Sequence, residues 1–132
     1  MFEILIGALF IIILGGLVLL IFHRRKKPKL TKTNFDLYSH QIFNTQNLDP
    51  AHAIIESHKA FVAAIKSMIP DSSNENAAEV IKKVVEQFKN ADAIWKFHRL
   101  RNQVAHETTV KISYEESHQA RQEFIRALKS LL

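Results

Sequence analysis

An uncharged apolar run close to the N-terminus constrains this chain more than any other feature. Ile4–Phe22 is 19 residues long and contains no charged or strongly polar side chain; only Gly7, Gly15 and Gly16 interrupt the larger apolar residues. As an α-helix this run spans about 28 Å, close to the hydrocarbon thickness of a bilayer. The run therefore predicts a transmembrane helix, with residues 1–23 as the anchor.

The charges on either side of the run predict its orientation. Only Met1, Phe2 and Glu3 precede it, whereas a basic cluster follows it: Arg24, Arg25, Lys26, Lys27 and Lys29. A cleaved secretory signal has its basic residues before the apolar run and small residues after it, which is the reverse of this order. The positive-inside rule places the basic cluster in the cytoplasm. We therefore predict an uncleaved single-pass anchor in the cell membrane, with its N-terminus outside and the remaining chain in the cytoplasm.

The formal net charge of +5 arises beside this anchor. Six of the 18 basic residues lie between 24 and 32, so residues 34–132 carry 12 basic and 12 acidic residues. The charge therefore indicates a membrane flank rather than nucleic-acid binding, and each basic residue contributes about 1 kcal/mol to attraction by anionic lipids. The chain has no cysteine, which excludes disulfides, a thiolate nucleophile and cysteine metal sites.

Residues 24–48 are expected to form a basic, proline-containing tether followed by an ambiguous segment. Asn34–Asn47 has loosely spaced apolar residues, and the sequence leaves open whether a short helix there packs on the domain or lies on the membrane. Asp49-Pro50 predicts a helix start, since aspartate caps helices and proline suits their first position. Apolar residues then recur at helical spacing as far as Ile69.

Three further helices are predicted after residue 70. Ser72-x-x-Glu75 and Ser113-x-x-Glu116 both have the capping-box pattern, and they introduce expected helices over about Glu75–Lys89 and from residue 113 to the C-terminus. Asn90–Glu107 is the third. The sequence therefore predicts an all-α protein: a transmembrane helix, then a small four-helix bundle over 49–132 with short loops.

The predicted helix over Asn90–Glu107 has two different faces. At 100° per residue, Trp95, Asn102 and His106 lie within about 40° of one another. Three apolar residues lie on the opposite side and are expected to pack inside the domain: Phe97, Leu100 and Val104. On another helix, His58 interrupts an apolar stripe, and we expect it to be a core histidine satisfied by a hydrogen bond.

Metal and cofactor chemistry has no support in the sequence. Seven histidines are scattered along the chain without a pair at metal-binding spacing on one helical face. All three glycines lie in the apolar run, so no glycine-rich loop is left to bind phosphates. We therefore predict no metal and no cofactor.

Leu100–Glu107, reading LRNQVAHE, resembles the signature of HEPN-like helical domains, in which an arginine and a following polar residue precede a histidine near a helix end. The resemblance extends back to Asp49-Pro50 and forward through the last amphipathic helix, and so covers about 49–132. It implies a four-helix up-and-down bundle that forms a homodimer and brings two copies of the motif together across a cleft.

Many HEPN-like proteins are metal-independent endoribonucleases, so the resemblance implies a catalytic set of Arg101, Asn102 and His106. His106 would move protons at the ribose hydroxyl or the leaving oxygen, Arg101 would stabilise the phosphorane-like charge, and Asn102 would orient one of them. An imidazole titrates near neutrality and a guanidinium binds phosphate through two hydrogen bonds, so the residue types suit this chemistry. The expected RNA-binding residues are Lys96, Arg99 and Trp95.

Non-catalytic readings remain open beside the ribonuclease. Other members of the resembled family act as binding or assembly modules, which here implies a dimerising interaction or scaffold module at the membrane, with a partner or neutralising protein. Trp95 then packs instead of stacking on bases, and the neutral soluble part needs no RNA. A third reading is an accessory subunit of a membrane complex.

Overall fold

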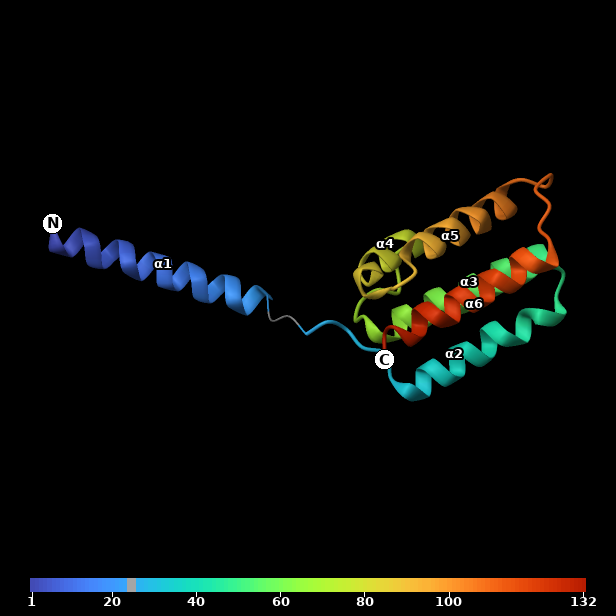
Figure 1. The fold of residues 1–132 in the computed structure, drawn as a ribbon, viewed down its shortest axis with the longest axis horizontal. Helices are drawn as coiled ribbons and strands as arrows, with labels where there is room; N and C mark the ends of the chain where they lie inside the picture. The colour runs from blue at the N-terminus through green and yellow to red at the C-terminus, as the bar shows by residue number, and fades with distance from the viewer. Residues whose placement is uncertain (24–25) are drawn as a thin grey trace.

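The computed structural model describes residues 1–23 and 26–132, and this part of the chain is all-α, with six α-helices and no strand (Figure 1). The α-helices are α1 (Phe2–His23), α2 (Lys32–Asn44), α3 (Pro50–Met68), α4 (Ala77–Lys82), α5 (Ala91–His106) and α6 (Tyr114–Lys129). Two short 3-10 helices, η1 (Thr45–Asn47) and η2 (Val85–Gln87), follow α2 and α4.

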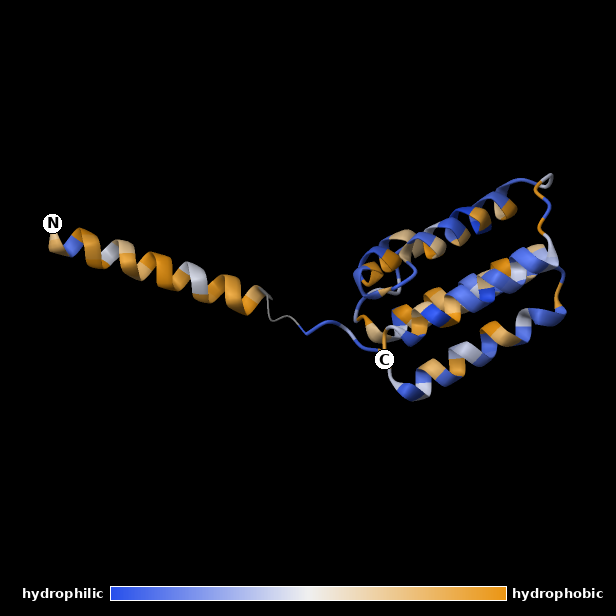
Figure 2. Ribbon diagram, viewed as in Figure 1, coloured by the Kyte–Doolittle hydropathy of each residue, from blue (hydrophilic) through white to orange (hydrophobic). Residues whose placement is uncertain are grey.

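Helix α1 is apolar along most of its length (Figure 2), and its residues Phe2–Phe22 are exposed. Phe2–Phe22 is long and apolar enough to cross a membrane, and none of it is buried against the rest of the protein. By length and composition, such an N-terminal helix is either a membrane anchor or a signal sequence. In the predicted basic flank, Arg24 and Arg25 lie outside the described residues, and Lys26, Lys27 and Lys29 are exposed.

The tether is fixed to the bundle before α2 begins. The backbone N–H of Leu30 donates to the carbonyl oxygen of Leu131 at 2.7 Å, and the Leu30 side chain is buried. The Gln87 amide donates to the carbonyl oxygen of Pro28 at 3.3 Å. The chain therefore enters the bundle beside both η2 and its own C-terminus, as Figure 1 shows.

The segment that the sequence left ambiguous forms α2, which packs against α3 and α6. Thr31 caps this helix by accepting a hydrogen bond from the Asn34 N–H at 3.2 Å. Ile42 is fully buried in the shared core, whereas Leu37 and Phe43 on the outer side are about half exposed. Of the two placements left open, α2 takes the one against the domain.

The core lies between α3 and α6, which contact each other extensively. As predicted, Asp49 caps α3 and Pro50 occupies its first turn, and Ser113 and Glu116 form the capping box of α6. The Phe61 and Phe124 rings stack at the centre, with centroids 4.9 Å apart. Five apolar residues of α6 and the segment that follows it are buried: Ala120, Phe124, Ala127, Leu128 and Leu131.

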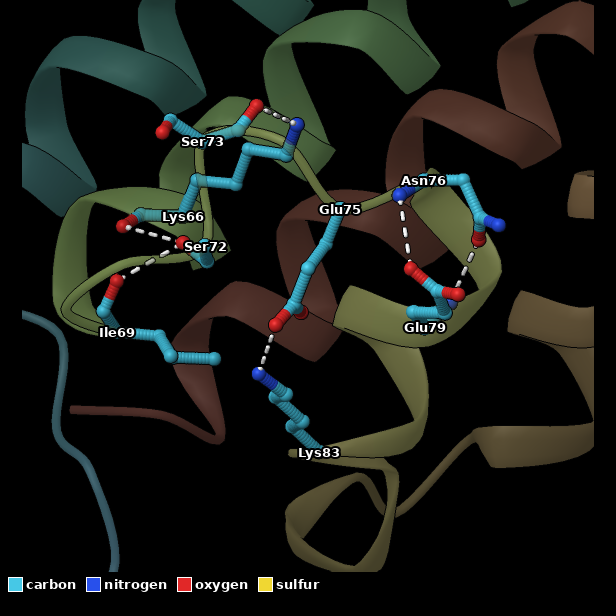
Figure 3. Close-up of polar contacts among 8 residues, drawn as sticks. All are labelled: Lys66, Ile69, Ser72, Ser73, Glu75, Asn76, Glu79 and Lys83. Atoms are coloured by element: carbon cyan, nitrogen blue, oxygen red, sulfur yellow. Dashed lines mark hydrogen bonds and ion pairs between the residues drawn. The ribbon is translucent and has the colours of Figure 1, made fainter.

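The prediction of one helix over about 75–89 is wrong, as is its capping box. Asp71 adopts a left-handed backbone, with φ of 61°, which turns Ser72 back so that its hydroxyl donates to the carbonyl oxygen of Ile69 at 2.8 Å. Asn76 and Glu79 form the capping box instead (Figure 3). The helix they start contains β-branched residues, which are weak helix formers, and it ends at Lys82.

Helix α5 forms where predicted, and most of the face expected to pack inside the domain does so. Its first turn is tied to α6, because the Asn90 amide donates to the carbonyl oxygen of Glu123 at 2.9 Å. Of the three residues expected to pack inside the domain, Phe97 is buried, Leu100 is partly buried against the core, and Val104 is partly buried. Helix α5 packs on α3 and α6, and Ile94 and His98 are buried there as well.

Candidate functional site

Four polar side chains form a hydrogen-bonded chain from the core to the surface of α5. His58 on α3 is 2% exposed, and its Nε2 lies 3.0 Å from Nδ1 of the buried His98. His98 Nε2 lies 3.3 Å from Asn102 Nδ2, and Arg101 donates to Asn102 Oδ1 at 3.1 Å. We call these four residues the polar chain. The prediction that His58 is a core histidine satisfied by a hydrogen bond is confirmed.

The donors and acceptors of the polar chain run in one direction. Because Asn102 Oδ1 accepts from Arg101, its Nδ2 faces His98, and an amide nitrogen can only donate. His98 Nε2 must then accept, so a neutral His98 carries its hydrogen on Nδ1 and donates to Nε2 of His58. Each bond polarises the next in the same sense. The chain therefore holds Arg101 in place and fixes the tautomers of both rings.

Both imidazoles are held in their neutral form. Burial lowers the pKa of His58 to about 3, and its electrostatic interactions with the His98 ring and with Arg101 lower it further. Burial also lowers the pKa of His98, with further contributions from Arg101 and Arg99. A neutral imidazole in this arrangement serves as a hydrogen-bond partner, and it orients the guanidinium without adding charge to the interior.

The polar chain reaches solvent at a pocket of about 390 Å³ between α3, α5 and the segment leading into α4. Arg101 lines this pocket together with Lys59 and Lys66 of α3. Glu75 contributes one carboxylate, which Lys83 binds from outside (Figure 3). Among the described residues, the buried Nε of Arg101 has no hydrogen-bond partner. We name this cavity the Arg101 pocket; its guanidinium and two ammonium groups suit an anionic or strongly polar group.

The structure brings together only part of the predicted catalytic set. Arg101 and Asn102 are hydrogen-bonded to each other. His106 is the last residue of α5, is exposed, and makes no hydrogen bond or ion pair with any described residue. Five residues of helix separate the directions of Arg101 and His106 by about 140°. Within one chain, the arginine therefore serves the polar chain while His106 faces solvent.

The residues predicted to bind RNA lie on the first half of α5. Trp95 is partly buried and packs edge-on against His98, with ring centroids 5.7 Å apart. Lys96 and Arg99 are exposed, and the Lys96 ammonium lies 5.1 Å from the centre of the Phe97 ring. Trp95 thus supports the histidine ring of the polar chain, and the two cations point into solvent beside it.

Sequence reasoning missed His98, which is central to the polar chain. The signal was available, since His98 is one turn from both Ile94 and Asn102 and lies between a buried position and the motif. Within the described residues, no group of three or more histidine, aspartate or glutamate side chains is placed to hold a metal ion.

Comparison with known proteins identifies no family. No protein-family model, curated protein or solved structure matches this chain.

Proposed function

We propose that this protein is a membrane-anchored, HEPN-like helical bundle that faces the cytoplasm and acts as an interaction module. One observation carries the proposal: an uninterrupted, wholly exposed apolar helix is joined by a short basic tether to a bundle that closes its own core. The apolar helix needs a bilayer to cover it, whereas the bundle forms its own buried core without one.

The order of charges favours an anchor over a cleaved signal sequence. Basic residues follow the apolar helix, and Glu3 is the only charged side chain before it. A signal peptidase needs small residues after the apolar segment, yet residues 23–29 contain only histidine, arginine, lysine and proline. The same charges favour the cytoplasm for the bundle.

The polar chain favours binding as the task of the bundle. Its two histidines are neutral and hydrogen-bonded, so they orient Arg101 instead of exchanging protons with solvent. The resemblance of Leu100–Glu107 to the HEPN signature adds the expectation of a homodimer. In this reading, Arg101 presents a guanidinium to a partner at the Arg101 pocket, and His106 lies at the interface between protomers.

Anchoring and orientation are tested by fusing a fluorescent protein that folds only in the cytoplasm after Leu132. We expect fluorescence in the membrane fraction that resists extraction at high pH, and an intact N-terminus by mass spectrometry. A chain released from the membrane without residues 1–23 would refute the anchor. Light scattering of the full chain in detergent, with and without His106→Ala, then tests whether that residue supports assembly.

Metal-independent RNA cleavage is the second candidate function. It is favoured by the guanidinium of Arg101, which lines a pocket, and by the exposed imidazole of His106 on the same helix. Because the two side chains point about 140° apart on one helix, the arginine of one protomer would have to meet the histidine of its partner. The test is cleavage of RNA by the full chain in EDTA, comparing wild type, His106→Ala and the matched surface control His118→Ala. Background rates in all three samples would remove this candidate.

A further inference from the structure

A second pocket, of about 410 Å³, shares no lining residue with the Arg101 pocket. Three cationic residues and one serine line it: Lys89, Arg126, Lys129 and Ser130. Lys89 follows η2, and the other three belong to the last turns of α6 and its end. We call this pocket, with its three cations, the basic end patch.

The charge of the basic end patch is largely uncompensated. Lys89 and Lys129 are exposed, and the ammonium group of neither forms an ion pair or hydrogen bond with the residues that the structure describes. Arg126 is exposed and has only a long contact of 3.9 Å with Glu123. That carboxylate is also bound by the amide of Asn90. Three cations with one shared acid leave a net positive surface, which attracts a polyanionic partner.

Two hydrogen bonds to the tether backbone place the basic end patch beside the tether. Gln87, two residues before Lys89, binds the carbonyl oxygen of Pro28, and Leu131, two residues after Lys129, accepts from the N–H of Leu30. Only residues 24–27 separate Pro28 from the end of α1. Five fully extended Cα–Cα steps cover at most about 18 Å. The patch is therefore held within a short distance of wherever α1 ends.

We propose that the basic end patch binds the phosphates of anionic lipid headgroups and so docks this end of the bundle on the bilayer. The inference rests on the proposed membrane anchor and goes beyond it, because an anchor alone leaves the bundle free to turn. Lys89, Arg126 and Lys129 supply donors around one depression, and the tether lysines 26, 27 and 29 extend the same positive surface toward the membrane. Docking leaves the α5–α6 connection, at the other end of α6, turned away from the lipid.

The test uses the full chain in nanodiscs made of phosphatidylcholine alone or of phosphatidylcholine mixed with phosphatidylglycerol. Acetylation rates of individual lysines are measured by mass spectrometry. Phosphate contact should slow Lys89 and Lys129 by about fivefold in the anionic discs, since each basic residue near such a surface contributes about that factor to binding. Lys59 and Lys111 are matched exposed controls and should react equally in both lipids. High salt should abolish the protection, because it screens these charges.

A variant separates the patch from a general surface effect. Arg126→Gln should restore most of the reactivity of Lys89 and Lys129 in anionic discs while leaving Lys59 and Lys111 unchanged. Equal rates for Lys89 and Lys129 in the two lipids, in a chain that co-elutes with the discs, would overturn docking and leave the anchor standing. Failure of the chain to co-elute with either disc would overturn the anchor itself, and with it the basis for docking.

Discussion

Acid should unfold this bundle through His58, and the structure gives the sign and size of the effect. The pKa of His58 is about 3 in the folded chain and about 6.5 when unfolded. Between these values the unfolded chain binds a proton that the folded chain refuses, so stability falls as pH decreases. The contribution is intact above about pH 6.5 and is fully lost below about pH 3. His98 shifts in the same direction.

The magnitude follows from the width of that window. Each pH unit within it costs about 1.4 kcal/mol, so His58 alone removes about 3 kcal/mol between neutral pH and about pH 4.5. The full window corresponds to about 5 kcal/mol, a large part of the stability of a typical small domain. Because His58 is 2% exposed, solvent screening reduces this effect little.

Urea unfolding of the full chain in detergent at several pH values measures the effect, with Trp95 as the single tryptophan reporter. Carboxylates also contribute to acid unfolding. We therefore compare the pH dependence of the unfolding free energy of the wild type with that of His58→Gln, in which the titration of His58 is removed. We expect the variant to be less stable at neutral pH but to lose about 3 kcal/mol less on acidification. His118→Gln, at an exposed histidine, is the control. Parallel pH profiles for wild type and His58→Gln would refute the reasoning.

Four further substitutions test the packing and the polar groups by urea denaturation. Phe124→Ala removes the ring that stacks on Phe61 and should cost about 3–5 kcal/mol, whereas Leu37→Ala on the exposed side of α2 should cost less than about 0.5 kcal/mol; similar losses would contradict the assigned core. Asn102→Ala leaves Arg101 and His98 without their shared partner and should cost about 1–3 kcal/mol. Ser113→Ala should cost about 1 kcal/mol by uncapping α6, and no change would mean that its cap is dispensable.

The sequence predicted those helices whose signals are local. Asp49-Pro50 and Ser113-x-x-Glu116 satisfy backbone N–H groups within one turn, so the pattern alone determines the start of the helix. Ser72-x-x-Glu75 has the same pattern but fails, because Ser72 is occupied with carbonyl groups at the end of α3. A serine that directly follows one helix can bond either to the end of that helix or to the start of the next. Here the left-handed backbone at Asp71 turns Ser72 toward the preceding helix.

The candidate site was less predictable because it depends on contacts between helices. Periodicity identified both faces of α5, but the helices that pack on it determine which residues are buried. His98 meets His58 across 40 residues of sequence, and no local rule pairs them. Arg101 and Asn102 are neighbours in the sequence, but their side chains leave the helix about 100° apart. Their hydrogen bond was therefore not predictable from helical geometry, because it depends on the conformation of the long arginine side chain.

The hydrogen bond between Leu30 and Leu131 brings the first and last residues of the bundle next to each other. Its first and last core residues are neighbours, so a short peptide could join them and new ends could be opened in the exposed connection between α5 and α6. Such a circular permutant should keep every helix-to-helix contact, since adjacent termini are what permit permutation. The packing of the helices therefore does not depend on the order in which they are synthesised. The apolar helix, in contrast, must join the bundle beside Leu30 if the basic end patch is to stay near the membrane.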